Sequence, residues 1–567
     1  MAVSNYIATD DLTIVLGLVA ACLFLLHNLY RPQSLVHPIL LGRQSDVARV
    51  RHPGESAVYR NYSTGMLGRF PVRPSKEQHV LIDLVKPDLD APRTLWSMKI
   101  TNPELRGRIA SFGTGLIHLT KLVPQESNAL LLLDDGIELL IADLALASYS
   151  VPSFMITSLS LLSSVIETHP PSVIITHASF LPHLLELILD SNDSTHIAIV
   201  VVGESNGKDV PGHVQLLKWD DVELHGSRLE QLPFATPNPK DVLSVSFYSS
   251  PSGELRGAQL THENLTAGVA ATRNLLPLSN AISPLDTIVS AFPMCTPYGR
   301  AVAYTAVNEG TSFATFDSTK MFVQKKNEAS DLADLLTASA LPIPSPTILF
   351  VKPSHLAALT SSILEAARSS SSLLYSLAWR HKYAAILDGY ITKQSLWDRL
   401  VFDSARAYAM GKGAGTVRAV LTGGGPIEAQ SLVPSRIALS VPLVNVHIHP
   451  LAAGPIFASH PLDLQTFLPN VKAAVGPAAN TYAFAYLAPV GPPSVNVEAK
   501  LLGVDDAAIE GGTDPIGTLV VRGPSVGKLL SGDDDEDEIE DERWVETGES
   551  AKVSSNGTFK VVSLSTK

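Results

Sequence analysis

The residues best suited to chemistry lie in one stretch, 245–265, with the sequence VSFYSSPSGELRGAQLTHENL. Its pattern predicts an apolar strand, a turn rich in serine and glycine, and a helix opened by Thr261. A turn at a helix N-terminus presents backbone N–H groups, hydroxyls and the positive end of the helix dipole to one point, and Arg256 adds a full charge. The stretch therefore predicts a phosphate-binding loop, although a simple reverse turn is the alternative. The candidate ligands are Ser249, Ser250, Ser252, Gly253, Arg256 and Gly257.

A second candidate site lies at 417–426, VRAVLTGGGP. Residues 417–421 are apolar and predict a buried strand. Because glycine has no side chain, Gly423, Gly424 and Gly425 would let the backbone approach a flat ligand such as adenine at the carboxyl end of that strand. This segment therefore predicts the surface that holds a nucleotide base.

The elements that must position these residues alternate between strands and helices. Helices are expected near 103–119 and 136–149, and strands at 129–133, 172–176 and 197–202. The strands are continuous runs of Val, Ile and Leu, which is typical of parallel strands covered by helices on both faces. The pattern predicts a layered α/β fold.

Composition excludes several classes of protein. The chain has 567 residues and is 45% hydrophobic, enough for a large core and more than one domain. Nine carboxylates in residues 533–542 account for most of the net charge of −13, leaving −4 elsewhere. No basic run or basic face is apparent, so nucleic-acid binding is excluded. With only Cys22 and Cys295, a disulfide framework is excluded and a reducing compartment is indicated.

The N-terminal segment predicts a membrane anchor. Residues 12–30 form an apolar run of 19 residues without charge, about 28 Å long as a helix. Arginines follow the run and none precedes it, which predicts a short lumenal tail at 1–11 and a cytosolic body. The endoplasmic reticulum is the expected membrane, and a helix buried against the body is the alternative. Sequons at Asn61, Asn192, Asn264 and Asn556 would report the topology.

Several of these blocks resemble the adenylate-forming (AMP-binding) superfamily. Residues 248–257, followed by Thr261, His262 and Asn264, resemble its phosphate-binding loop, although one residue is missing from the loop. The blocks PTILFVKP at 346–353, WDRLVF at 397–402 and the segment 417–426 look like the long-chain acyl-CoA synthetase branch, of the fungal type. The resemblance implies the large N-terminal domain of that fold. We expect a lead-in at 31–94, an α/β body at 95–440, a β-rich subdomain at 441–562 with a solvated acidic loop at 533–542, and a tail at 563–567.

The resemblance also implies ligands and further site residues. ATP or AMP would bind at the loop and at the glycine-rich strand end. Thr547 and Glu549, in WVETGE, match a family motif whose Asp accepts hydrogen bonds from the ribose hydroxyls. Tyr298 and Gly299 would border a pocket for a fatty acid or an acyl-CoA, with plain core packing as the alternative.

Two departures argue against the family's chemistry. Leu451 stands where the family has a Glu that helps to hold magnesium, so no metal ligand and no catalytic residue is assigned. His447 and His449 share one face of a strand but lack a third ligand for a metal. The family continues into a small mobile domain with a catalytic Lys and part of the coenzyme A site, and we expect that domain to be absent after Val562. Neither Mg²⁺ nor coenzyme A is therefore expected as a cofactor.

These observations together predict a membrane-anchored protein similar to long-chain acyl-CoA synthetases. We expect it to be catalytically degenerate and to act as an acyl- or nucleotide-binding module, or as a scaffold for a partner protein, in fatty-acid metabolism. The first alternative is an active ATP-dependent long-chain fatty acid–CoA ligase, or an enzyme of one half-reaction. The second is a structural membrane protein without a ligand.

Overall fold

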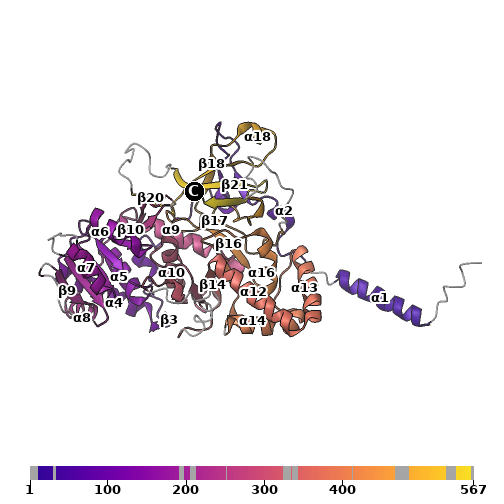
Figure 1. The fold of residues 1–567 in the computed structure, drawn as a ribbon, viewed down its shortest axis with the longest axis horizontal. Helices are drawn as coiled ribbons and strands as arrows, with labels where there is room; N and C mark the ends of the chain where they lie inside the picture. Colours follow the sequence, from indigo (N-terminus) through magenta and orange to yellow (C-terminus); the bar gives the residue numbers. More distant parts are fainter. Residues whose placement is uncertain are drawn as a thin grey trace, which may run out of the picture.

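The fold is built on three β-sheets (Figure 1). The computed structural model describes residues 11–29, 33–190, 197–204, 212, 214–250, 252–322, 334, 342–411, 413–466, 484–530 and 544–563. The acidic run at 533–542 and the sequon at Asn192 lie outside the described residues. Among those described, two sheets have eight strands each and one has six.

The first sheet carries the phosphate-loop candidate and has the order β20-β11-β10-β6-β5-β7-β8-β9. Its strands from β10 to β9 are parallel, and those at its centre are buried. The predicted parallel α/β arrangement is therefore confirmed. The strands are β5 (Ala129–Leu132), β6 (Ser153–Ile156), β7 (Val173–His177), β8 (Ile197–Val202), β9 (Val214–Lys218), β10 (Val242–Ser249), β11 (Leu255–Thr261) and β20 (Lys528–Leu529). Its helices include α4 (Asn102–Thr120), α5 (Ile137–Ser148), α7 (Leu181–Asp190) and α8 (Trp219–Arg228).

The second sheet carries the glycine-rich strand end and has the order β17-β16-β15-β14-β12-β13-β3-β4. Its central strands, from β16 to β3, are also parallel, so their carboxyl ends meet at one edge. The strands are β3 (Arg93–Leu95), β4 (Met98–Ile100), β12 (Thr287–Ser290), β13 (Ser312–Thr315), β14 (Ile348–Val351), β15 (Ala419–Thr422), β16 (Leu443–His447) and β17 (Phe457–Ala458). Helices of this region include α10 (Pro297–Glu309), α12 (Pro353–Ser370), α13 (Ser372–Leu387), α14 (Asp403–Met410) and α16 (Leu432–Leu439).

The third sheet is antiparallel and joins the two ends of the described chain. Its strands are β1 (Ser45–Val47), β2 (Tyr59–Asn61), β18 (Glu498–Leu502), β19 (Ile516–Arg522), β21 (Val545–Val553) and β22 (Phe559–Ser563). The lead-in segment thus supplies two strands to the sheet that is otherwise formed by residues 498–563. The domain boundaries given above stay a prediction.

A buried polar cluster joins the first two sheet layers. Arg300 of α10 donates to Asp143 of α5 at 2.5 and 3.2 Å and to the hydroxyl of Ser244 in β10 at 2.6 Å. Tyr304 also donates to Asp143. All four side chains are fully buried, with Arg300 and Asp143 at 0% exposure. Since each charge has partners of opposite sign or polarity, the cluster holds α5, α10 and β10 together.

The expected membrane segment corresponds to helix α1 (Asp11–Leu29), while Tyr30 lies outside the described residues. Within the part of the chain that the structure describes, no helix has both the length and the apolar character needed to cross a membrane. The predicted anchor is therefore not confirmed.

Candidate nucleotide site

The phosphate-loop candidate is a tight hairpin between β10 and β11, and not a turn at a helix N-terminus as predicted. Three of its N–H groups are bonded within the loop: Ser250 to the Glu254 carbonyl at 2.9 Å, Gly253 to the Ser250 carbonyl at 2.9 Å, and Glu254 to the Ser250 hydroxyl at 3.1 Å. The helix that follows, α9 (His262–Arg273), begins only after β11. The expected set of unpaired N–H groups is therefore wrong for the described loop residues.

The helix start itself follows the prediction. The Thr261 hydroxyl accepts from the Asn264 N–H at 3.2 Å, and the Asn264 side chain accepts from the Thr261 N–H at 2.8 Å. His262 is buried and accepts from the Leu81 N–H at 3.2 Å, and burial lowers its pKa to about 4. The Thr-His-x-Asn segment therefore fixes the helix to its surroundings, with a neutral histidine as an acceptor.

The remaining loop candidates are two serines that bond to each other, an arginine that supplies charge and a glycine that the packing requires. Ser250 and Ser252 share a hydrogen bond between their hydroxyls at 2.7 Å. Arg256 is 42% exposed, and its guanidinium lies 3.7 Å from the Glu254 carboxylate. At Gly257 a Cβ would lie 3.0 Å from both Leu530 and Val245, so this position serves packing. Arg256 is thus the candidate that brings a positive charge to the surface of this loop, in an ion pair with Glu254.

The glycines after β15 lie where the strand ends. At Gly423 a Cβ would lie 2.5 Å from the Val446 side chain, which brings β15 and β16 close together. Gly424 has a φ of +77°, a conformation that disfavours other residues, and together with Gly425 it is exposed. The exposed backbone at the carboxyl edge of a parallel sheet is the geometry in which α/β folds bind ligands.

Two histidines of β16 and the turn after it face the motif that contains Thr547 and Glu549. The His447 Nε2 lies 2.8 Å from the Glu549 carboxylate, and both side chains are largely buried, at 14% and 13% exposure. Burial alone would raise the pKa of Glu549, but the charge and hydrogen bond of His447 outweigh it and lower that pKa. His449 Nε2 lies 3.1 Å from the Thr547 carbonyl, and burial lowers the pKa of His449. The structure thus brings the predicted ribose ligand into contact with His447, which the sequence did not indicate.

Leu451 lies in the turn that follows β16. It is 3% exposed and forms a small apolar cluster with Tyr248 and Ala258, against which Leu529 and Val545 pack. Within the described residues, no group of three or more His, Cys, Asp or Glu side chains is placed to hold a metal ion. Leu451 has no side-chain atom that binds a cation, and the expected absence of Mg²⁺ stays a prediction.

A cavity of about 400 Å³ opens above Leu451. Its lining is Arg256, Leu451, Lys528, Leu529, Trp544, Val545, Glu546 and Gly548. The cavity has an apolar floor and carries two cations against one carboxylate, which suits an anionic group. Lys528 and Trp544 were not among the predicted site residues. The sequence signal for Trp544 was available, since it opens the motif that contains Glu549.

The acyl-pocket candidates lie at the start of α10. Tyr298 is 2% exposed, its ring centre lies 5.1 Å from that of Phe292, and its buried hydroxyl has no partner among the described residues. A Cβ at Gly299 would lie 2.0 Å from the Pro293 carbonyl oxygen, so this helix start requires glycine. Both residues are core positions in this structure, and their role beside an acyl group stays a prediction.

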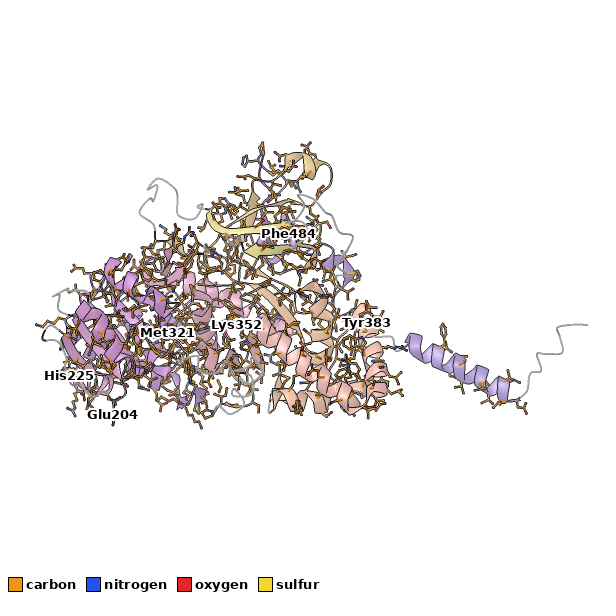
Figure 2. All side chains as sticks on the ribbon, in the orientation of Figure 1. Glu204, His225, Met321, Lys352, Tyr383 and Phe484 are labelled. Atoms are coloured by element: carbon orange, nitrogen blue, oxygen red, sulfur yellow. The ribbon has the colours of Figure 1, made fainter. Side chains whose placement is uncertain are left out.

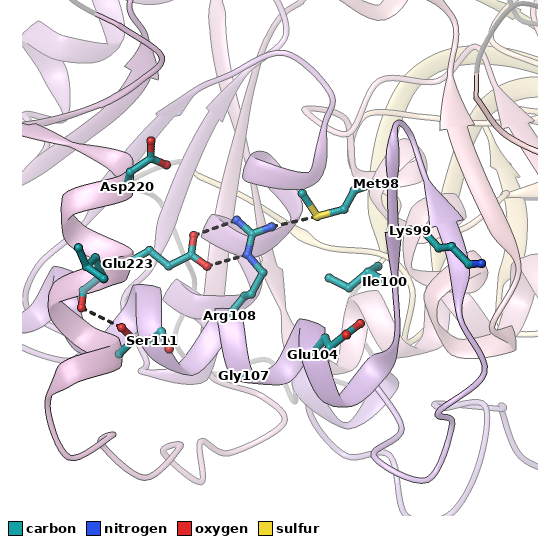
Figure 3. Close-up of a pocket in the computed structure, with 11 residues that line it drawn as sticks. Met98, Lys99, Ile100, Glu104, Gly107, Arg108, Ser111, Asp220 and Glu223 are labelled. Atoms are coloured by element: carbon teal, nitrogen blue, oxygen red, sulfur yellow. Dashed lines mark hydrogen bonds and ion pairs between the residues drawn. The ribbon is translucent and has the colours of Figure 1, made fainter.

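A larger cavity, of about 660 Å³, lies between α4, α8 and the β4 strand (Figure 3). Arg108 crosses it and pairs with both carboxylate oxygens of Glu223 at 2.6 and 2.8 Å. None of the predicted site residues lines this cavity. Of the predicted nucleotide ligands, Arg256 lines the smaller cavity.

Comparison with known proteins identifies the family of this chain. Residues 86–447 match the model of the AMP-binding enzyme family, which is more than half of the chain. The chain therefore belongs to the AMP-binding enzyme family, and the adenylate-forming resemblance read from the sequence is confirmed.

The curated relatives are long-chain fatty-acid ligases. The chain is 25% identical over 353 residues to mouse long-chain-fatty-acid–CoA ligase 5, covering 62% of this chain and 46% of that protein. It is 25% identical over 334 residues to human long-chain-fatty-acid–CoA ligase 1, covering 58% and 41%. The chain spans less than half the length of these two relatives.

Solved structures share the fold. A long-chain-fatty-acid-CoA ligase from Archaeoglobus fulgidus matches with a TM-score of 0.56 and 14% identity, covering 87% of this chain and 84% of that one. An anthranilate CoA ligase in complex with anthranoyl-AMP matches with a TM-score of 0.59 and 16% identity, covering 86% and 78%. The adenylate-forming α/β fold is thereby confirmed.

Proposed function

We propose that this protein is a long-chain acyl-CoA-synthetase-like member of its family that binds an adenine nucleotide or an acyl group without turning it over. In this proposal the adenine lies against the backbone at Gly424 and Gly425, the ribose meets Glu549, and the phosphate enters the cavity beside Arg256. The protein then acts as a binding or scaffolding module in fatty-acid metabolism.

One observation carries the proposal: the position expected to hold magnesium is a buried leucine. In-line attack at a phosphate needs a divalent cation or an equivalent clamp to neutralise the charge that develops. Leu451 supplies no ligand, and its neighbours Tyr248 and Ala258 make the site apolar. The internal bonding of the Ser250 hairpin also withdraws N–H groups that a triphosphate would need.

The alternative is an active ATP-dependent long-chain fatty acid–CoA ligase. It is favoured by the curated relatives, which are ligases of that name. An active ligase must release pyrophosphate from ATP when a fatty acid is added, whereas a binding module must not.

Calorimetry and pyrophosphate release together separate the two functions. We expect the full chain to bind ATP or AMP, with equal affinity in EDTA and in Mg²⁺, and to release no pyrophosphate with a long-chain fatty acid. Release that depends on the fatty acid would overturn the proposal in favour of the ligase. Failure to bind either a nucleotide or a fatty acid would favour a structural protein.

A matched pair of variants sharpens this test. Leu451→Glu introduces the carboxylate, so ATP affinity should become at least about fivefold higher with Mg²⁺ than with EDTA. Leu451→Gln has a similar size without the charge and should leave the affinity independent of Mg²⁺. Equal behaviour of the two variants would show that this position does not face the phosphates.

Several finer features stay predictions. They are the fungal type, the partner protein and the location of the body on the cytosolic side of the endoplasmic reticulum. Asn264 is a poor reporter of topology, because its side chain donates to the carbonyls of Pro524 and Val526 at 2.9 and 3.1 Å. The Asn61 side chain donates to the Pro493 carbonyl at 3.1 Å in the same way, so glycosylation is better followed at Asn556.

A further inference from the structure

Helix α13 is apolar on two sides. Its buried side faces the core of the second sheet layer through Tyr375, Ala378, Lys382 and Ile386. The single charge on this side, Lys382, is bonded to Asp398, to the Ser440 hydroxyl and to the Thr392 carbonyl. The charge on the buried side of α13 is therefore satisfied within the chain.

The outward side of α13 is also apolar. Leu373, Leu377 and Leu387 are 74%, 43% and 56% exposed. With Arg380 and Ala384, which are also exposed, they follow the spacing of one helical face. A helix that is apolar on both sides is normally covered on both sides. This outward stripe, defined by Leu373, Leu377, Arg380, Ala384 and Leu387, is thus an interaction surface without a described partner.

The segment after α13 enlarges this surface. The rings of His381 and Trp397 lie 6.3 Å apart, which places residues 396–400 alongside α13. Leu396 and Leu400 are 66% and 55% exposed there. Isolated exposed leucines are common, but five on adjacent elements form a patch.

Two arginines lie on the surface itself. Arg380 is part of the stripe and Arg399 lies in the segment 396–400, and both are exposed. The acid of that segment, Asp398, is buried and bonded to Lys382. The surface therefore combines leucines with arginines, a combination typical of segments that lie in the headgroup region of anionic lipid.

The position of the surface also favours anionic lipid as its partner. The Leu35 N–H donates to the Gly389 carbonyl at 2.9 Å, so the segment that follows α1 is held at the end of α13. Figure 1 shows α1 beyond this end of the body, and Figure 2 labels Tyr383 of α13 on the same side. Tyr383 is itself 37% exposed, and leucines of α1 are 57–65% exposed at Leu12, Leu16, Leu18 and Leu25. Apolar surface thus continues from α13 toward α1.

We propose that the outward stripe of α13 docks on an anionic lipid surface. The leucines enter the boundary between headgroups and acyl chains, and the arginines pair with lipid phosphates and carboxylates. The nucleotide site takes no part in this contact, so the proposal stands apart from the proposed function.

A fluorescent label tests the contact in the full chain. Cys22→Ser and Cys295→Ser together remove both thiols of the chain. An environment-sensitive dye is then attached at Leu377→Cys or, as a matched control, at Leu278→Cys, where the leucine is 96% exposed. With vesicles of mixed phosphatidylcholine and phosphatidylserine, the emission at position 377 should shift to the blue, and that at 278 should not.

Further variants and controls decide against the alternatives. Arg380→Gln combined with Arg399→Gln should reduce the shift several-fold and remove the preference for phosphatidylserine. Equal shifts at both labels, or no shift at 377 while the protein floats with the vesicles, would overturn the proposal. A blue shift at 377 without vesicles that grows with protein concentration would overturn it in favour of a second copy of this chain.

Discussion

Two carboxylates in this molecule have a nitrogen-bearing side chain as partner, one an arginine and the other a histidine, but the two pairs differ in their surroundings. Asp143 and Arg300 have 0% exposure and are joined by Tyr304 and Ser244. Glu549 and His447 are 13% and 14% exposed, and their side chains meet between β16 and β21. The first pair has no exposed surface, whereas the second keeps a small exposed part.

The difference separates a structural pair from a pair that can exchange partners. Removing one member of a buried pair leaves an unpaired charge without water, which is costly. Removing one member of a partly exposed pair leaves a group that water or a ligand hydroxyl can serve. Under the proposed function Glu549 accepts a ribose hydroxyl, whereas Asp143, with 0% exposure, lies out of the reach of a ligand.

The largest expected effect comes from breaking the pair of Asp143 and Arg300. Arg300→Met should lower the free energy of unfolding by about 3–5 kcal/mol, because Asp143 then remains charged and buried. Urea unfolding followed by circular dichroism measures the change. The double variant Asp143→Leu with Arg300→Met should recover a large part of the loss, and a double variant as unstable as the single one would contradict this account.

Asp135 is a buried carboxyl group of a different kind, and its contribution to the free energy of unfolding should depend on pH. The Asp135 Oδ1 accepts from the Met294 N–H at 2.9 Å, its Oδ2 is a buried atom with no hydrogen-bond partner among the described residues, and burial raises its pKa to about 7. The folded state then binds a proton that the unfolded state has released, so stability falls as the pH rises from about 4 to about 7. Asp135→Asn should remove this slope and stabilise the protein at pH 8 by on the order of 2 kcal/mol. Unfolding at pH 5 and at pH 8 tests it, and an unchanged pH profile would contradict it.

The smallest expected effect on stability comes from the pair of Glu549 and His447. Glu549→Gln should cost roughly 1 kcal/mol or less, since its partner remains partly solvated. In the wild type this contribution is present above pH ~4.3 and is lost as the pH falls through the lowered pKa of Glu549. The same variant should weaken nucleotide binding about tenfold, because a hydrogen bond to a charged acceptor is lost. A stability loss as large as that of Arg300→Met, with nucleotide affinity unchanged, would reverse the assignment of roles.

Strands and helices were predicted correctly from the sequence where a short stretch of residues carries the pattern. Residues 197–202 were expected to form a strand and are β8, and the helix expected at 103–119 is α4 at Asn102–Thr120. These elements carry continuous apolar runs or a clear capping pattern. The strand β11 was missed, because Arg256 and Gly257 interrupt its apolar pattern and the turn before it looks like a helix start.

The site was predicted by residue type but not by its contacts. Glu549 and His447 were both singled out, yet their pairing joins residues 102 positions apart, and no local pattern carries that information. Asp143 and Arg300, which are 157 positions apart, were not predicted. A charged residue inside an otherwise apolar helix is the only signal that either gives. Residue types therefore define candidates, and tertiary pairing decides which of them remain available to a ligand.

The third sheet has a consequence for how the chain reaches its final form. The Ser45 hydroxyl donates to the Gly557 carbonyl, a partner 512 residues later, and β2 pairs with β18. At roughly 5–20 residues per second, a ribosome needs on the order of 25–100 s between making these two positions. The lead-in strand β2 lacks its partner β18 through most of that interval, so this sheet is expected to close late, and a chaperone would have this edge to protect until then.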